Sequence, residues 1–209
     1  MSPVRLCIFA RAPVLHAVKT RLASSIGADA ALAAHEELVN LALSQMADIP
    51  GLSCELWIAG PLDHAKVVQW SHHWQLPIVA QQGDDLGARM SHAIQTCLDE
   101  SGRVLVVGTD CPDMTSGYVQ QAVTALHNHD LVLGPAEDGG YGLIGLRKPA
   151  PSLFENMRWG TDTVLQVTLE RALQIGLSYQ LLTTIWDVDD AVDWDRFRAS
   201  RSSSEADQP

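Results

Sequence analysis

The sequence predicts an α/β protein whose strands form a parallel sheet between helices. Apolar runs of strand length alternate with stretches in which apolar residues recur at helical spacing. One run, Val104 to Val107, is unbroken and ends at Gly108, which is typical of a strand buried on both faces. The hydrophobic fraction of 46% suffices for a full core. We expect one domain over residues 1–199 and a disordered polar tail over 200–209.

Turn residues and helical spacing divide the first half of the chain into six elements. Pro50-Gly51 and Gly60-Pro61 end the first long helix and the second strand, because proline and glycine interrupt regular structure. Asp84 or Asp85 is expected to cap the helix after the third strand. The predicted strands are Val4–Ala10, Leu52–Ala59 and Pro77–Gln81, and the predicted helices are Asp29–Met46, His64–His73 and Leu86–Leu98.

The second half continues the alternation and adds a hairpin. The dipeptide Asp138-Gly139 between two apolar runs is the strongest hairpin signal. Thr161 or Asp162 is expected to cap the helix that opens at Trp159-Gly160-Thr161. The predicted strands are Leu131–Leu133, Tyr141–Leu146 and Leu177–Ile185, and the predicted helices are Ser116–His127, the one after Thr161, and a short one that ends near Arg198.

Two carboxylates, Asp110 and Asp113, follow the central strand directly. In open α/β sheets the ligand crevice lies beyond the carboxyl ends of such strands. A carboxylate there can hold a hard cation through oxygen. The alternative is that one of the two aspartates only caps the following helix. We expect Asp110 to serve the cation, and both roles stay open for Asp113.

The segment R-A-P-V-L-H-A-V-K-T-R gathers positive charge in an acidic protein. Arg11, Lys19 and Arg21 could neutralise phosphates, which in such folds dock on the loop after the first strand. No glycine occurs before Gly27, so the segment is neither a P-loop nor a G-x-G-x-x-G fingerprint. The alternative is an ordinary solvated basic loop.

Two other loops combine aspartate with glycine. Gln82 to Gly87 reads Q-G-D-D-L-G, and its exposed backbone, with Asp85 and the nearby Arg89, suits a base or a ribose. The tip of the predicted hairpin reads E-D-G-G. A plain turn is sufficient reason for that tip, but a hairpin tip can also carry function.

Four aspartates follow the last strand in W-D-V-D-D-A-V-D-W. Alternation along an extended chain points Asp187 and Asp189 the same way, and both could face the crevice at Asp110. Asp190 and Asp193 are expected to cap and charge the first turn of the last helix. The alternative makes the whole cluster a capping device.

Composition excludes some partners. A formal net charge of −11 argues against nucleic acid, because phosphate binding needs a basic surface. No apolar run approaches the roughly 20 residues that cross a bilayer, and the start M-S-P-V-R lacks a signal-peptide core. Four cysteines without a C-x-x-C pair are typical of reduced thiols in a cytoplasm. A homodimer is compatible with the sequence, which does not give the oligomeric state.

Six motifs, taken in order, resemble a DUF2064-type family of GT-A-like glycosyltransferases. This family is related to nucleotide-diphospho-sugar transferases and similar to phospholactate guanylyltransferases. The resemblance covers about residues 4–198. The motifs are F-A-R-A-P…V-K-T-R-L at Phe9–Leu22, D-L-G-A-R-M at Asp85–Met90, G-T-D-C-P-D at Gly108–Asp113, G-P-A-E-D-G-G-Y-G-L-I-G at Gly134–Gly145, W-G-T at Trp159–Thr161 and D-V-D at Asp187–Asp189.

The resemblance implies a GT-A fold, a three-layer α/β/α sandwich with a mostly parallel mixed sheet that binds a nucleotide at its N-terminal half. It implies Mg²⁺ or Mn²⁺ on Asp110 and Asp189, and a catalytic group of Asp110, Asp138 and Lys19. With the loops described above, the expected nucleotide and phosphate contacts are Arg11, Lys19, Arg21, Asp85 and Arg89. The side of the sugar or acceptor would comprise Asp138, Gly139, Gly140, Tyr141, Trp159 and Thr161.

Two positions depart from the family pattern. His16 stands where a glycine is usual, which puts a close backbone approach in doubt. Gly142 stands where a second aromatic residue often follows Tyr141, which alters the expected acceptor pocket.

Three functions follow from these residues. The first is metal-dependent glycosyl transfer from a nucleotide-sugar to a small-molecule acceptor. The second is nucleotidyl transfer from a nucleoside triphosphate to a small phosphorylated acceptor, which the paired cations of the K-T-R loop favour. The third is a nucleotide-binding protein without chemistry, against which the intact D-C-P-D and D-V-D carboxylates argue.

Overall fold

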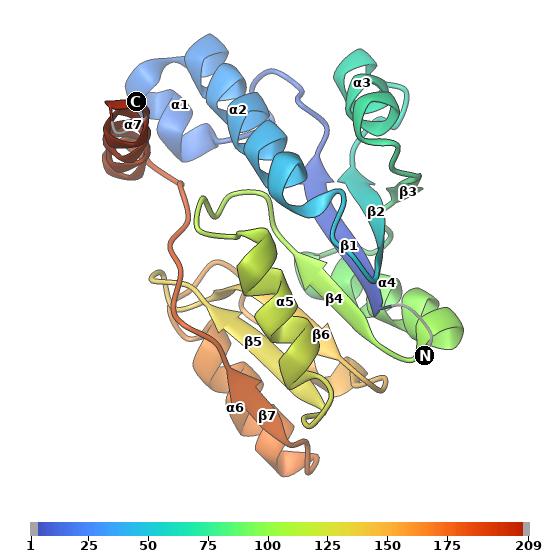
Figure 1. Cartoon of the computed structure of the whole chain (residues 1–209). Coiled ribbons are helices and arrows are strands. Elements are labelled where there is room, and N and C mark those ends of the chain that lie inside the picture. Colours follow the sequence, from blue (N-terminus) through green and yellow to red (C-terminus); the bar gives the residue numbers. More distant parts are fainter. Residues whose placement is uncertain (1–3, 207–209) are drawn as a thin grey trace.

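A central sheet with helices on both faces confirms the predicted three-layer architecture (Figure 1). The computed structural model describes residues 4–206, and the side chains of residues 4–202. The strands are β1 (Val4–Arg11), β2 (Leu52–Ala59), β3 (Ile78–Ala80), β4 (Val104–Val107), β5 (Leu131–Pro135), β6 (Tyr141–Leu146) and β7 (Tyr179–Leu181). The helices are α1 (Thr20–Ile26), α2 (Ala28–Met46), α3 (Ala65–Trp74), α4 (Leu86–Ser101), α5 (Ser116–Ala125), α6 (Val164–Gln174) and α7 (Ala191–Ala206), with one 3₁₀ turn, η1 (Pro151–Leu153).

The direction of the strands fixes where a ligand can bind. The sheet order is β3-β2-β1-β4-β6-β5-β7, and β6 alone runs against its neighbours β4 and β5. The carboxyl ends of the other six strands therefore meet at one edge. From β1 the chain continues outward to β2 and β3, whereas β4 lies on the opposite side of β1. A crevice is expected beyond the ends of two adjacent strands whose connections diverge in this way.

Alternate residues of β1 build the two cores. Leu6 and Ile8 pack into the cluster that contains α2, α3 and α5, and Cys7 and Phe9 pack into the cluster that contains α4 and α6. In Figure 1, α2 and α5 accordingly lie in front of the sheet, and α4 and α6 lie behind it. All four β4 residues are buried, as the unbroken apolar run predicted.

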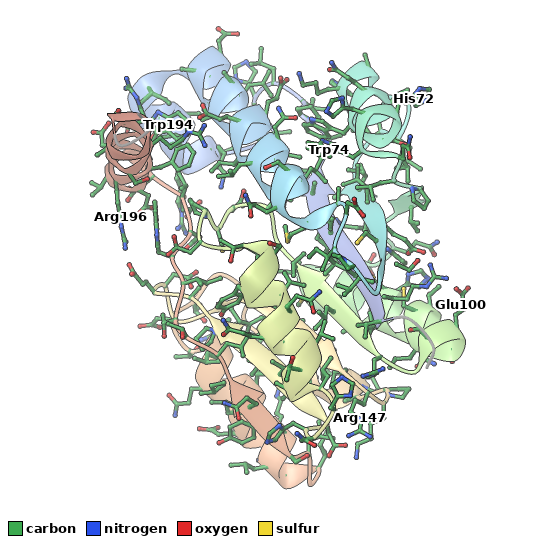
Figure 2. All side chains as sticks on the ribbon, in the orientation of Figure 1. His72, Trp74, Glu100, Arg147, Trp194 and Arg196 are labelled. Carbon is green, nitrogen blue, oxygen red and sulfur yellow. The ribbon has the colours of Figure 1, made fainter. Side chains whose placement is uncertain are left out.

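The C-terminal segment returns across the sheet edge to the N-terminal helices. Trp194 of α7 packs beside Leu22 of α1, and α7 lies next to α1 in Figure 1. Arg196, labelled in Figure 2, stacks over Trp186 at 4.1 Å and forms two hydrogen bonds with the carboxylate of Glu137. These contacts hold α7 and Trp186 against α1 and the β5–β6 hairpin.

Several predicted boundaries differ from the structure. Helix α1 was not predicted, because it is only seven residues long and its N-cap, Lys19, has a left-handed backbone with φ 46°. The expected strand Leu177–Ile185 pairs continuously only over β7, and Ile185 makes one isolated bridge to Ala136. Helix α6 starts later than expected, with Thr163 as its N-cap. Glycine and polar residues in these loops favour turns, which explains why the regular elements are shorter there than predicted.

The end of the chain also differs. Helix α7 continues to Ala206, beyond the predicted end near Arg198 and into the segment expected to be disordered. Arg201 lies 3.9 Å from Glu37 of α2, and Ser202 donates a hydrogen bond to the carbonyl of Arg198, so helical contacts extend past residue 200. Residues 207–209 of the predicted tail lie outside the described residues.

No helix in residues 4–206 is long and apolar enough to cross a membrane.

His16 keeps the backbone conformation that glycine would adopt. Its φ is 65°, in the left-handed region, and its side chain is exposed. A left-handed conformation costs an L-residue roughly 1–2 kcal/mol. The turn is therefore preserved without glycine, at a cost in strain.

We expect His16→Val to lower the free energy of unfolding by about 1–2 kcal/mol, because a β-branched residue tolerates the left-handed region worst. His16→Gly should be neutral or stabilising by up to about 1 kcal/mol, since relief of strain is partly offset by the greater freedom of glycine in the unfolded chain. Urea denaturation measures both, with Leu15→Val as an exposed neighbouring control. A harmless His16→Val would contradict a strained turn.

Candidate functional site

A large cleft opens at the carboxyl ends of β1 and β4, where the sheet topology places the crevice. Its volume is about 680 Å³. Arg11 and Phe9 from β1, Asp110 after β4 and Arg89 from α4 line its walls. Three segments that are remote in sequence thus meet around one space. Of the predicted residues, Arg11, Lys19, Asp85, Arg89, Asp110 and Asp189 all line this cleft.

The Lys19 ammonium lies at the centre of the site. It is 2.9 Å from the Asp110 carboxylate and donates a hydrogen bond to the carbonyl of Val188 at 2.6 Å. The Lys19 side chain is 5% exposed, whereas that of Asp110 is 47% exposed. A buried ammonium needs such partners, because the loss of hydration is otherwise uncompensated. Lys19 therefore fixes the carboxylate and the C-terminal segment relative to each other.

Arg21 and Asp189 form a second pair at the rim. Their atoms lie 2.6 Å apart, and both side chains are largely exposed. Arg21 lines a separate pocket of about 270 Å³, the outer acidic pocket, and does not line the large cleft. The outer acidic pocket is lined by Arg21, Glu137, Asp138, Trp186, Asp187, Asp189, Asp190 and Asp193.

Asp190 and Asp193 cap α7, as predicted. The Asp190 carboxylate accepts hydrogen bonds from the backbone N–H groups of Val192 and Asp193, and the Asp193 carboxylate accepts from those of Asp189 and Asp190. This reciprocal arrangement satisfies donors at the helix start that would otherwise be unpaired. Capping accounts for these two aspartates but not for Asp187 or Asp189.

A smaller space of about 280 Å³, the inner chamber, adjoins the large cleft. The two share Leu86, Gly108 and Asp110 in their walls. Of the residues expected on the sugar or acceptor side, all except Gly139 line the inner chamber. These lining residues are Asp138, Gly140, Tyr141, Trp159 and Thr161.

Two glycines shape the inner chamber. Gly139 has φ +85°, and a Cβ atom there would lie 2.2 Å from the carbonyl oxygen of Asp162. Its role is thus to let the hairpin tip approach the start of α6. At Gly142 a Cβ atom would lie 2.7 Å from the Cys111 sulfur. An aromatic residue would not fit at this position without repacking, so the departure from the family pattern changes the wall itself.

The tip of the β5–β6 hairpin forms a turn and also places the carboxylate of Asp138 in the site, so the two interpretations of this loop are compatible. β5 and β6 pair as antiparallel neighbours, and the Asp138 carboxylate accepts a hydrogen bond from the backbone N–H of Gly140 at 2.8 Å. Asp138 lines both the inner chamber and the outer acidic pocket. The turn therefore holds this carboxylate at the boundary between the two spaces.

Asp187 joins this group with a raised pKa. Burial, and after it the nearby Asp138 and Asp189 carboxylates, raise the pKa of its carboxyl to about 6, although Lys19 opposes the shift. Asp187 and Asp189 do face the same region, as strand alternation predicted, since both line the outer acidic pocket.

The other predictions have mixed outcomes. Asp85 accepts a hydrogen bond from the backbone N–H of Ala88 at 2.7 Å and so caps α4, as predicted. Arg89 donates to the carbonyl of Gly83, which anchors its side chain at the cleft wall. Asp113 caps nothing, because Thr115 is the N-cap of α5. It also lines none of the three spaces.

Sequence reasoning missed two residues in the cleft wall. Gln81 follows β3 at the same sheet edge, and its side-chain amide donates to the carbonyls of Ala10 and Trp57. Its position after a strand was a usable signal. His35 comes from within α2, and its Nε2 lies 3.0 Å from the carbonyl of Arg11. Nothing in the local sequence distinguishes it from a core histidine.

The predicted metal ligands are compatible with a hard cation. Asp110 and Asp189 both line the large cleft with exposed carboxylates, and Mg²⁺ usually takes only one or two protein carboxylates together with phosphates and water. Each carboxylate is paired with a cationic side chain in the structure, Lys19 or Arg21, so a metal ion would share the carboxylate with that side chain.

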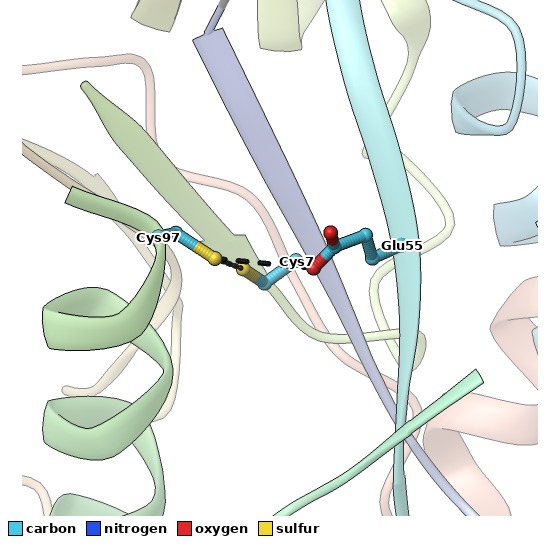
Figure 3. Close-up of side chains that lie close together, drawn as sticks. All are labelled: Cys7, Glu55 and Cys97. Carbon is cyan, nitrogen blue, oxygen red and sulfur yellow. Dashed lines mark hydrogen bonds between the residues drawn. The ribbon is translucent and has the colours of Figure 1, made fainter. Parts of the chain in front are cut away.

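One group of three possible ligands lies elsewhere, in the core behind the sheet (Figure 3). Cys7, Glu55 and Cys97 bring their ligand atoms within 4.8 Å of one another. Arg5 and the Trp57 indole already bind Glu55, and a hydrogen bond with Cys97, followed by burial, raises the pKa of Cys7. Soft metals bind the thiolate form of cysteine, and a raised pKa keeps Cys7 in its thiol form. This environment therefore favours a packing contact between the two thiols. All four cysteines are free.

Comparison with known proteins identifies the family. Residues 42–161 match the family described as "Uncharacterized protein conserved in bacteria (DUF2064)". The chain belongs to this family. The predicted resemblance is therefore confirmed over more than half of the sequence.

Individual proteins that are similar to this chain carry transferase names. A crystal structure from Desulfovibrio desulfuricans G20, described as a "putative nucleotide-diphospho-sugar transferase", has 34% identity and a TM-score of 0.85 over 94% of this chain and 87% of its own. The 2-phospho-L-lactate guanylyltransferase of Methanothermobacter thermautotrophicus is 27% identical over 119 residues, which is 53% of each chain. The chain thus matches about half the length of this curated relative.

A more distant structure shows the fold alone. The 4-diphosphocytidyl-2C-methyl-D-erythritol synthase of Anaerococcus prevotii DSM 20548 shares 11% identity and a TM-score of 0.65, over 96% of each chain. These neighbours confirm the predicted GT-A-like fold with its mixed sheet.

The buried His35 makes the stability of the protein sensitive to acid. Burial lowers the pKa of His35, and the hydrogen bond to the Arg11 carbonyl opposes this shift. The unfolded chain, with an ordinary value of about 6.5, then binds a proton first as the pH falls. The contribution of His35 is complete above pH ~6.5 and is lost toward the lower folded-state value.

We expect the free energy of unfolding of His35→Gln to fall less between pH 7.5 and 5.5 than that of the wild type. Urea melts at both pH values measure the difference. Asp187 titrates in the opposite direction in both proteins and cancels in this comparison. Parallel pH profiles would show that His35 is not the titrating group.

Proposed function

We propose that the protein is a metal-dependent glycosyltransferase that takes a nucleotide-diphospho-sugar and transfers the sugar to a small-molecule acceptor. The observation that carries the proposal is the junction of two spaces at Asp110. One side is a large cleft with Arg11, Lys19 and Arg89, and the other is a chamber without basic residues among its lining groups. A nucleotide diphosphate matches the first and its sugar matches the second.

Each side of this junction has a chemical task. Arg11 and Arg89 provide planar cations for phosphate oxygens, and Lys19 keeps one N–H free after binding Asp110 and Val188. Gln81, Asp85 and the surrounding backbone offer hydrogen bonds for the base and ribose. With the diphosphate in the large cleft beside Asp110, the sugar would enter the inner chamber with its anomeric carbon toward Asp138.

The transfer itself needs a base and a stabilised leaving group. The acceptor hydroxyl attacks the anomeric carbon, the bond from that carbon to the phosphate oxygen breaks, and the nucleoside diphosphate leaves with the bonding electrons. Asp138, at the boundary of the inner chamber and the outer acidic pocket, takes the proton of the acceptor hydroxyl. Lys19 and the arginines balance the charge that accumulates on the leaving diphosphate.

The cation fits the same junction. Asp110 and Asp189 would hold Mg²⁺ or Mn²⁺, which adds charge stabilisation on the diphosphate.

Nucleotidyl transfer is the second candidate. It is favoured by the similarity to a guanylyltransferase, and the cations Arg11, Lys19 and Arg89 of the large cleft would also suit a triphosphate. The same cleft would then hold the triphosphate, and pyrophosphate would leave instead of a nucleoside diphosphate.

The two reactions release different products, and this difference tests the proposal. The protein is incubated with Mn²⁺ and UDP-glucose or GDP-mannose, and in parallel with GTP and 2-phospho-L-lactate. Slow release of UDP or GDP from the sugar nucleotides, with water as the acceptor of the sugar, and no release of pyrophosphate from GTP are expected. Pyrophosphate release alone would establish the second candidate.

Asp110→Asn should abolish the Mn²⁺-dependent gain in nucleotide affinity, because an amide is a poorer ligand for a hard cation than a carboxylate. The melting temperature without ligand should fall, because the buried Lys19 ammonium loses its negatively charged partner, but the variant should still fold, since the Asn amide oxygen can accept the same hydrogen bond. Calorimetric titration of UDP and GDP with and without Mn²⁺ measures the effect, and Asp113→Asn is the matched control on the same loop. Undiminished metal-dependent binding would remove Asp110 from this role.

Asp189 and Asp193 are neighbours with different expected roles. Asp189→Ala should reduce turnover at least about tenfold with little loss of stability, because it orients Arg21 and the cation at an exposed rim. Asp193→Ala should cost about 1 kcal/mol of stability, through the lost helix cap, and largely keep turnover. Steady-state kinetics and urea melts of both variants separate the two. Equal effects on both measurements would make the whole cluster a capping device.

A further inference from the structure

Charge is divided sharply between the two spaces that meet at Asp110. Among the described residues, the large cleft is lined by Arg11, Lys19 and Arg89 as well as by carboxylates. Of the side chains that line the inner chamber, the charged ones are all carboxylates: Asp110, Asp138 and Asp187. The inner chamber therefore presents negative charge to any group that enters it.

Little within the chamber neutralises that charge. Lys19 pairs with Asp110, whereas Asp138 and Asp187 have no basic side chain within 4.0 Å in the described part of the chain. The Asp138 carboxylate receives one backbone N–H, from Gly140. Carboxylate oxygens accept more than one hydrogen bond each, so both residues have capacity left for hydroxyl donors.

The remaining walls are apolar or aromatic. Tyr141 and Trp159 meet edge to face with ring centroids 6.4 Å apart, and Leu86, Met90 and Val164 add apolar surface to the lining. Such surfaces pack against the C–H groups of a ring, and carboxylates bind its hydroxyl groups. The combination suits a small ring that carries hydroxyls and no negative charge.

We infer that the inner chamber selects an uncharged, hydroxylated sugar ring on the donor nucleotide and rejects sugars that carry a carboxylate or a phosphate. The inference rests on the proposed function and names the substrate class of that site. It also separates this chain from its guanylyltransferase relative, whose named acceptor, 2-phospho-L-lactate, is an anion.

The physical reason is like-charge repulsion in a partly enclosed space. An additional carboxylate on the ring would lie between Asp138 and Asp187, and no basic side chain lines the chamber to compensate its charge. The diphosphate of the same donor is not penalised, because its place is the large cleft with the basic side chains. The chamber thus discriminates by the sugar alone.

Matched pairs of nucleotide-sugars isolate this effect. UDP-glucose and UDP-glucuronate differ only in the group at C6, a hydroxymethyl in the first and a carboxylate in the second, and GDP-mannose and GDP-mannuronate form an equivalent pair. Calorimetric titration of the full-length protein with Mn²⁺ should give Kd values at least about tenfold lower for the uncharged member of the pair whose base binds. UDP and GDP alone report on the nucleotide cleft.

Variants connect the selectivity to the two carboxylates. Asp138→Asn keeps an oxygen that can accept the Gly140 N–H, so the turn is retained while the charge is lost. This variant should bring the two members of the pair closer together in Kd without changing the Kd of the free nucleoside diphosphate. Asp187→Asn is a second variant with the same expected outcome. Asp99→Asn, on the exposed surface of α4, removes the same charge far from the site and should leave the ratio unchanged.

The outcomes distinguish this inference from the proposed function. If UDP or GDP binds, and the charged nucleotide-sugar binds as tightly as the uncharged one or more tightly, the inference is wrong, although the protein still has a nucleotide site. An unchanged ratio in both Asp138→Asn and Asp187→Asn would also overturn it. Absence of binding by every nucleotide and nucleotide-sugar would instead overturn the proposed function, and the inference with it.

Discussion

The contact of Lys19 with Asp110 and the Val188 carbonyl organises this molecule. It joins the loop after β1, the end of β4 and the segment before α7, which are remote from one another in sequence. The lysine side chain is almost fully buried, so its charge must be compensated where it lies. Two of its three donors do this, and they also set the separation of the segments. The cleft has its shape because this ammonium allows few other arrangements.

The sheet explains why so many carboxylates gather around that contact. Six strands end at one edge, and the loops beyond them are free of the packing that fills the sheet with apolar residues. Asp85, Asp110, Asp138 and Asp187 reach the same region from four different connections. Basic residues come from β1, its following loop and α4, on one side of Asp110 only. The division of charge is thus a consequence of which connection supplies which residue.

Local signals predicted the parts of this arrangement that local physics decides. The apolar run of β4, the returning strand β6, the Asp85 cap and the Asp190–Asp193 pair all depend on neighbouring residues, and the sequence predicted each of them. Helix α1 depends on the left-handed Lys19, which tertiary contacts hold, and the role of His35 depends on the loop above α2. Such features depend on tertiary contacts and therefore cannot be predicted from the neighbouring residues alone. The pairing of Lys19 with Asp110, rather than with a phosphate alone, belongs to this second group.

The two departures from the family pattern, His16 and Gly142, have different consequences because one is exposed and the other is tightly packed. His16 lies on an exposed turn, so the loop after β1 keeps its left-handed backbone at the cost of some strain. Gly142 sits inside, against Cys111 and Ile185, and no side chain fits there without moving its neighbours. The substitution at the exposed position 16 affects the stability of a turn, whereas the one at position 142 alters the wall of the inner chamber. The departure at Gly142 should therefore alter the inner chamber, whereas the departure at His16 should leave the large cleft unchanged.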